Sequence, residues 1–113
     1  MYYLHYTGIA RLDPLNDAII RERNQMTITC EAIGYPPPTI IWNIINQTLS
    51  DRVSVSDSVS VPTGNGNVTR VSVNLTITNA SRKDTGVYTC SANNSTGSDS
   101  RNMSITVQCK VLL

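Results

Sequence analysis

The residue types that carry most enzyme chemistry are scarce in this chain and widely spaced. The 113 residues include one histidine, His5, three cysteines and eight carboxylates, which are dispersed along the sequence. Metal-ligand spacings of the Cys-x-x-Cys or His-x-x-x-His kind, Asp-rich calcium loops and glycine-rich phosphate loops are all missing from it. His5 lies in an N-terminal end, residues 1–7, that we expect to be flexible. No Ser–His or Cys–His pair can then form inside a packed domain, so the sequence predicts no enzyme, no metal and no cofactor.

The charge balance argues against two classes of partner. Only 15% of the residues are charged and the formal net charge is +1, which creates no field to attract nucleic acid or an anionic membrane. The nine basic residues are scattered, and Arg82-Lys83 is the only adjacent pair. We therefore expect no nucleic-acid partner.

No apolar run approaches the roughly 20 residues of a membrane-spanning helix, so we expect no direct insertion into a membrane. The first residues lack the basic and apolar stretches of a signal peptide. Either a signal was removed together with the natural N-terminus or the chain is a segment of a longer protein. We favour the segment.

The hydrophobic pattern indicates β-strands that must position any functional side chain. Apolar and polar residues alternate over 26–30, 53–56, 71–77 and 103–107, which gives each segment one apolar and one polar face. Turn signals separate these segments. A stiff proline loop is expected at 34–38, a tight hairpin at the Asn-Gly pair of 64–67 and a last turn at 94–97. Several short strands of this kind are typical of an antiparallel sandwich or barrel.

Four features occur together at informative spacings. Cys30 and Cys90 are 60 positions apart, Trp42 lies 12 positions after the first cysteine, and Tyr88 lies two positions before the second, in the run 84–90. With the segments 34–42, 75–77, 92–93 and Gly97, these residues resemble the immunoglobulin superfamily, specifically its intermediate (I-set) type. The resemblance covers about residues 8–108 and leaves 109–113 as a tail or the start of a linker.

The resemblance implies an all-β, Greek-key sandwich of two antiparallel sheets with a disulfide between Cys30 and Cys90. A bridge closing a loop of that length stabilises the fold by roughly 4 kcal/mol. The resemblance also implies strand C near 40–45, strand E near 69–78, strand F near 86–93 and strand G near 98–108. The residues expected in the core are Trp42, Tyr88, Leu75 and Ile77.

Arg52, expected at the start of strand D, is expected to form a salt bridge with Asp84. The alternative is two solvated charges that contribute about 0–1 kcal/mol.

The sequons favour an extracellular location over the interior of muscle, where similar domains also occur. Seven Asn-x-Ser/Thr sequons are present, against roughly 2.4 expected by chance from 11 asparagines and 25 serines plus threonines. Such sites accept glycans only in the secretory pathway. The candidate glycosylation sites are Asn46, Asn67, Asn74, Asn79, Asn93, Asn94 and Asn102. Asn93 and Asn94 overlap, so we expect at most one of them to be occupied.

Cys109 falls beyond the last expected strand and is not explained by the family pattern. It is either a free thiol at the boundary of the segment or a partner in an intermolecular or interdomain disulfide.

Strand alternation predicts which face could bind a partner. If Trp42, Tyr88 and Cys90 point into the core, the opposite side chains form the outer face of the C–F–G sheet. The candidate binding residues on that face are Ile41, Asn43, Ile45, Val87 and Thr89. Exposed apolar patches tend to mark interfaces, although three aliphatic side chains on a sheet are also ordinary. Glycans at Asn46 or Asn102 would shield this face in part.

Two functions from different classes remain at this point. The first is an ectodomain module of a cell-surface adhesion molecule or receptor, which binds a protein partner, itself included as a homodimer. The second is a structural spacer among neighbouring immunoglobulin-like domains of an extracellular matrix protein. An intracellular scaffold is a more distant third, which glycan occupancy would exclude.

Overall fold

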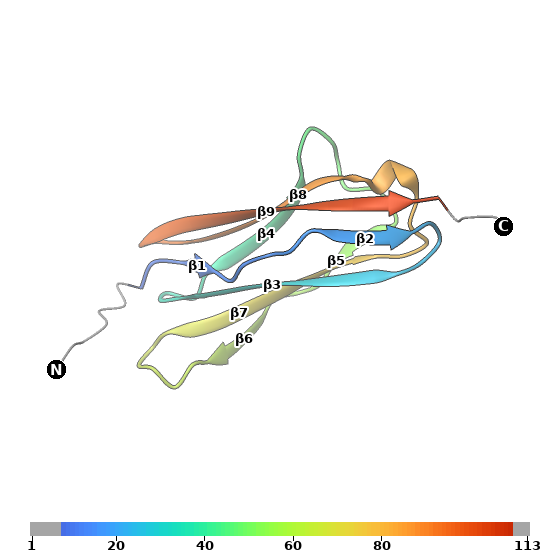
Figure 1. Cartoon of the computed structure of the whole chain (residues 1–113). Coiled ribbons are helices and arrows are strands. Elements are labelled where there is room, and N and C mark those ends of the chain that lie inside the picture. Colours follow the sequence, from blue (N-terminus) through green and yellow to red (C-terminus); the bar gives the residue numbers. More distant parts are fainter. Residues whose placement is uncertain (1–7, 110–113) are drawn as a thin grey trace.

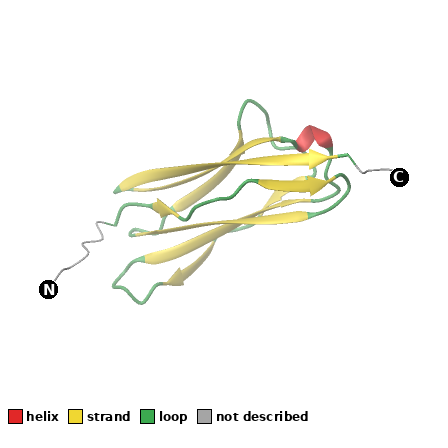
Figure 2. Cartoon of the chain, in the orientation of Figure 1, coloured by secondary structure: helices red, strands yellow, loops and turns green. Residues whose placement is uncertain are grey.

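Two β-sheets pack face to face in this protein (Figure 1). The computed structural model describes residues 8–109, and almost all of its regular structure is strand (Figure 2). The strands are β1 (Arg11–Leu12), β2 (Ala18–Arg21), β3 (Met26–Gly34), β4 (Thr39–Ile44), β5 (Val53–Val55), β6 (Val59–Pro62), β7 (Thr69–Ile77), β8 (Gly86–Asn94) and β9 (Gly97–Gln108), with a short 3-10 helix η1 (Arg82–Asp84) before β8.

The strand order is that of a Greek-key sandwich. The first sheet runs β1-β3-β7-β5, with β6 also paired to β7, and the second sheet runs β2-β9-β8-β4. Every pairing is antiparallel except that of β2 with β9, which is parallel. The segment that starts in the first sheet as β1 therefore crosses to the second sheet as β2. The predicted fold class, an all-β immunoglobulin-like sandwich, is confirmed.

The core lies between the sheets and follows the alternation of the sequence. Leu75 and Ile77 of β7, Tyr88 of β8 and Trp42 of β4 are all buried. Cys30 of β3 and Cys90 of β8 are joined by a disulfide that links the two sheets, with a Cα–Cα distance of 6.6 Å. Trp42 is the register partner of Cys90 across β4 and β8, which places the indole in the row beside the disulfide.

The edge of the first sheet departs from simple alternation. Val55 pairs with Leu75, and Val59 pairs with Ser72, so one extra residue is inserted on the edge strand between β5 and β6. A bulge of this kind reverses which side chains face outward. As a result Val59 and Val61 lie on the outer face of the sheet and are exposed.

The tight hairpin expected at the Asn-Gly pair is instead a longer loop over residues 63–68. Gly64 and Gly66 adopt positive φ angles of 82° and 59°, conformations that glycine reaches without strain. Thr63 closes the loop, because its backbone N–H and its hydroxyl both donate to the carbonyl of Val68.

The other expected boundaries differ from the structure by about one residue, as strand ends usually do between assignments. The expected flexible end, residues 1–7, with His5, lies outside the described residues, as do residues 110–113. Cys109 is described, and its thiol is free and exposed.

Candidate protein-binding face

The outer face of the second sheet carries the predicted apolar side chains. Its strands β4, β8 and β9 are the expected strands C, F and G. Ile45, directly after β4, donates its backbone N–H to the carbonyl of Val87 on β8 at 2.9 Å, so these two residues are cross-strand neighbours. Ile41 lies on the same face but pairs with Ser91, and the row of Asn43 and Thr89 separates it from the other two. The exposed fractions of Ile41, Ile45 and Val87 are 48%, 43% and 37%. The three therefore form one adjacent pair and one separate aliphatic side chain.

The cross-strand neighbours of this pair on β4, β8 and β9 are polar and uncharged. On β9, Ser104 lies opposite Val87 and Asn102 lies opposite Thr89. Charged residues are depleted at the centres of protein interfaces, and small polar groups can be desolvated there at moderate cost. We name the Ile45–Val87 pair with its Asn43–Thr89 row and Ser104 the outer C–F–G patch.

Ile19 on β2 extends the same face and was missed by sequence reasoning. It pairs with Thr106 of β9 and is 65% exposed. In the run Ala18-Ile19-Ile20-Arg21 two adjacent isoleucines leave the inward position ambiguous. Only the parallel register with β9 shows that Ile20 enters the core and Ile19 faces out.

The structure brings Arg52 and Asp84 together at one end of the sandwich. The Asp84 carboxylate accepts hydrogen bonds from Nε and Nη2 of Arg52, both at 2.9 Å, from the Ser50 hydroxyl at 2.8 Å and from the Ser81 backbone N–H at 2.9 Å. Burial opposes the charge of Asp84, but the hydrogen bonds from Arg52, Ser81 and Ser50 prevail and hold its pKa below its usual value. The pKa of Arg52 is raised, first by its hydrogen bond to Asp84. This arrangement clamps the start of β5 to the loop before β8.

Tyr88 ties the same loop to the core. Its hydroxyl donates to the backbone carbonyl of Asp84 at 2.6 Å, the geometry of a tyrosine corner. Burial, with a smaller contribution from the Asp84 charge, raises the pKa of Tyr88 to about 12. The phenol therefore stays protonated at neutral pH and keeps this bond.

At the opposite end Asn94 joins three segments. Its Nδ2 donates to the carbonyls of Gly8 at 2.7 Å and Pro36 at 2.9 Å, and its Oδ1 accepts from the backbone N–H groups of Thr96 and Gly97. Both amide hydrogens are therefore engaged. The proline loop, the β8–β9 turn and the start of the described chain are held together by this one side chain.

The sequons occupy different environments. Asn46, Asn67, Asn79 and Asn102 are exposed, and the first and third of them lie in turns with φ angles of 62° and 50°. Asn74 and Asn93 are half-buried, and the Oδ1 of Asn74 accepts from the Thr29 hydroxyl at 2.7 Å. Asn46 follows Ile45 directly, and Asn102 lies on the outer face beside Thr89.

Within residues 8–109 nothing gathers that resembles a catalytic or metal centre. In this part of the chain no three His, Cys, Asp or Glu side chains are placed to hold a metal ion. An open groove lies where the chain crosses between the sheets and is lined by Leu15, Asp17, Met26, Ile28 and Met103 among others. Its carboxylate, Asp17, accepts the backbone N–H of Ser104 at 2.8 Å. The described residues also contain no helix with the length and hydropathy required to cross a bilayer.

Comparison with known proteins agrees with this architecture. Residues 11–94 match the family model described as "Immunoglobulin domain". The chain therefore belongs to the immunoglobulin domain family, which is generally non-enzymatic, and its features are those of the I-set type.

The relatives in sequence are much longer proteins. Neural cell adhesion molecule 1 of Gallus gallus is 32% identical over 93 residues, which are 82% of this chain and 8% of that protein. Hemicentin-1 of Homo sapiens is 35% identical over 82 residues, which are 73% of this chain and 1% of that protein. The chain thus spans less than a tenth of either of these two relatives.

Solved structures share the fold. A chimeric titin Z1Z2 structure gives a TM-score of 0.71 at 21% identity, covering 90% of this chain and 96% of that one. Titin domain M7 gives 0.68 at 24% identity, covering 88% and 93%. At these identities the likeness concerns the fold alone.

Proposed function

We propose that this domain is an extracellular protein-binding module of a cell-adhesion molecule or cell-surface receptor, and that it binds through the outer C–F–G patch. The observation that carries the proposal is the exposed Ile45–Val87 pair, whose cross-strand neighbours on β4, β8 and β9 are uncharged. The similarity to neural cell adhesion molecule 1 supports the class. The domain performs no catalysis, and its partner is a protein, a second copy of this chain being the first to test.

A spacer domain in a chain of similar domains is the second candidate. Its support is the small size of the outer C–F–G patch, because Ile41 does not join the pair. A spacer would tolerate charged residues anywhere on this face.

Charge substitution in the patch distinguishes these functions. In a Cys109→Ser background, which removes thiol cross-links, we expect a reversible dimer in sedimentation velocity over a wide concentration range. Ile45→Asp or Val87→Asp should weaken that dimer at least about tenfold, because a carboxylate would be desolvated at its centre. Val61→Asp is the matched control, since Val61 is 51% exposed on the outer face of the other sheet and should have no effect. A monomer at every concentration would refute homophilic binding and favour a different protein partner or the spacer.

The extracellular location has its own test in the pattern of glycosylation. We expect a domain secreted from animal cells to carry N-glycans at the exposed Asn46, Asn67, Asn79 and Asn102, and none at Asn94. A glycan is attached at Nδ2, and at Asn94 both hydrogens of that atom are donated to backbone carbonyls. Transfer precedes folding, so a chain modified at Asn94 would lose one of these bonds and would be depleted from the folded, secreted protein.

Peptide mapping after enzymatic deglycosylation in heavy-oxygen water reads each site separately. Ser95→Ala is the useful variant, because it removes the sequon of Asn93 and keeps that of Asn94. Asn94 should remain empty in it. Substantial occupancy of Asn94 in the folded protein would contradict the structural argument, and the absence of all glycans would contradict the extracellular location.

A further inference from the structure

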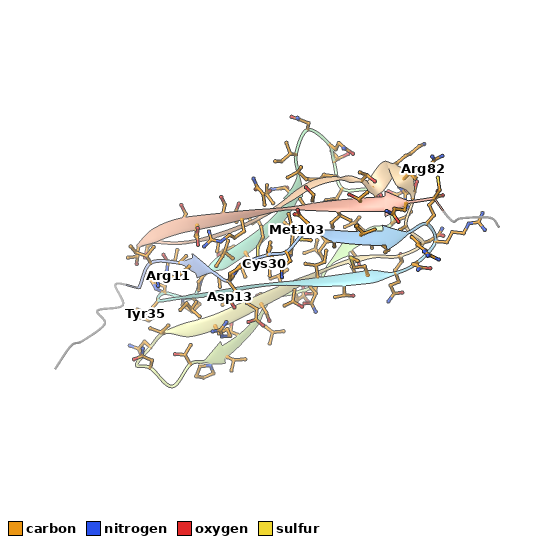
Figure 3. The ribbon with its side chains drawn as sticks, in the orientation of Figure 1. Arg11, Asp13, Cys30, Tyr35, Arg82 and Met103 are labelled. Carbon is orange, nitrogen blue, oxygen red and sulfur yellow. A yellow bond between two sulfur atoms is a disulfide. The ribbon has the colours of Figure 1, made fainter. Side chains whose placement is uncertain are left out.

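Four basic residues that are far apart in the sequence lie together at one end of the sandwich. The turn between β2 and β3 and the loop between β7 and β8 are hydrogen-bonded to each other. The Arg23 N–H donates to the Ala80 carbonyl at 2.8 Å, and the Ala80 N–H donates to the Asn24 carbonyl at 3.1 Å. Figure 3 shows Arg82 at this end, opposite the end that holds Tyr35. We name Arg21, Arg23, Arg82 and Lys83 the basic pole.

These cations differ from the others because they lack strong partners. Arg52, Arg70 and Arg101 each contact a carboxylate at 2.9 Å or less. By contrast, among residues 8–109 the side chains of Arg21, Arg23 and Lys83 have no ion pair, and all three are exposed. Arg82 meets Glu22 only at 3.4 Å, with its side chain 69% exposed. The four cations therefore face one weakly paired carboxylate, Glu22, because the neighbouring Asp84 is buried and already paired with Arg52.

We propose that the basic pole is a second binding site, distinct from the outer C–F–G patch, and that it binds a sulfated polysaccharide. Uncompensated cations held close together repel one another, and a polyanion relieves this while releasing its condensed counterions. Three of the four are arginines, whose planar guanidinium groups donate paired hydrogen bonds to oxyanions.

The neighbourhood favours a hydrophilic polyanion over a protein or a lipid surface. The uncharged polar residues of the two loops are Asn24, Gln25, Thr78, Asn79, Ser81 and Thr85, and the exposed large hydrophobic side chain nearest in sequence is Ile19 on β2. Protein interfaces have an apolar centre, and helices that lie on membranes insert apolar side chains. The basic pole offers neither feature. Because the formal net charge of the chain is only +1, the attraction is local and is screened by salt.

Heparin is the probe, measured against the intact domain in the Cys109→Ser background between about 50 and 300 mM NaCl. We expect binding whose dissociation constant rises steeply with salt. The triple variant R21Q/R23N/K83Q should bind heparin at least about tenfold more weakly. The slope of its log binding constant against log salt concentration should be smaller by close to three, because about three fewer counterions are released. Asparagine is used at position 23 because Arg23 has a φ of 70°, which asparagine tolerates. Arg11→Gln is the matched control and should change affinity less than about twofold, because Arg11 lies at the other end (Figure 3).

The thermal midpoint of the triple variant should equal that of the parent, since the three side chains have no ion pairs to lose. The proposal would be overturned if the variant and the parent bound heparin with equal affinity, or if the parent did not bind heparin at the lowest salt concentration. Equal binding of chemically desulfated heparin would overturn it as well. Tighter binding to phosphatidylserine vesicles or to DNA at the same salt would assign the basic pole to a membrane or a nucleic acid instead. None of these readouts depends on self-association through the outer C–F–G patch.

Discussion

Replacing Cys30 and Cys90 together by alanine is expected to lower the free energy of unfolding by about 4 kcal/mol. The disulfide closes a loop with a sequence separation of 60 residues, and opening it restores that conformational freedom to the unfolded chain. The loss is large against a total stability of about 5–15 kcal/mol. The core around Trp42 and Leu75 is otherwise unchanged, so we expect the variant to remain folded at neutral pH with a much lower denaturation midpoint.

Urea denaturation followed by the fluorescence of Trp42, the single tryptophan, measures this effect. Cys109→Ser is the control, because the Cys109 thiol is exposed and unbonded and its loss should leave the midpoint in place. A difference of less than about 1 kcal/mol between the double variant and the parent would show that the bridge does little to constrain the unfolded chain.

Asp84→Asn is expected to cost about 3 kcal/mol at pH 7, because it removes a buried charge from donors that are arranged around it. The carboxylate side chain is 1% exposed and accepts from Arg52, Ser50 and the Ser81 N–H. An amide of the same shape has one oxygen and presents its NH2 group to donors on the other side. Asp57→Asn, at an exposed carboxylate, is the matched control and should be neutral within about 0.5 kcal/mol.

The pH dependence gives an independent reading of Asp84. Its pKa in the folded state lies below its ordinary value of 3.8, so its contribution is fully present above that pH and is lost as pH falls through the folded pKa. Stability of the parent should therefore decline from about pH 4 downward, and the decline should be shallower in Asp84→Asn. Some acid sensitivity remains, because the N–H of Leu12 and the Arg101 side chain also hold the pKa of Asp99 low against its burial. Parallel pH profiles for variant and parent would contradict this assignment.

The sequence carried enough information to predict the centre of the fold. Cysteine, tryptophan and tyrosine at fixed spacings define the core group of Cys30, Trp42, Tyr88 and Cys90, and each of these side chains is buried as the alternation requires. Strands with one apolar face have a period of two, so inward and outward positions on β4 and β8 followed directly from the pattern.

Features that depend on register or on turns could not be predicted in the same way. A bulge shifts the pattern by one residue, and a sequence with Val53, Val55, Val59 and Val61 gives no sign that the last two face outward. The separation of Ile41 from Ile45 and Val87 also appears only once the β4–β8 register is known. Arg21 and Arg23 are interpreted from the sequence as scattered charges, because the bonds that join their turn to the loop of Arg82 are made by backbone groups of Arg23, Asn24 and Ala80.

The contacts of the β8–β9 hairpin with the N-terminal part of the chain have a consequence for biosynthesis. Asn94 reaches Gly8, Asp99 reaches Leu12, and Ser104 reaches Asp17, across sequence separations of 86 or 87 residues. A ribosome delivers the chain from its N-terminus, so β2 waits for its partner β9 until almost all of the domain has been made. Until then β8 lacks its neighbour β9, and the backbone groups on that side remain unpaired. An unpaired edge of this kind can pair with other chains, so the pace at which residues 97–108 emerge determines how long the domain is exposed to aggregation.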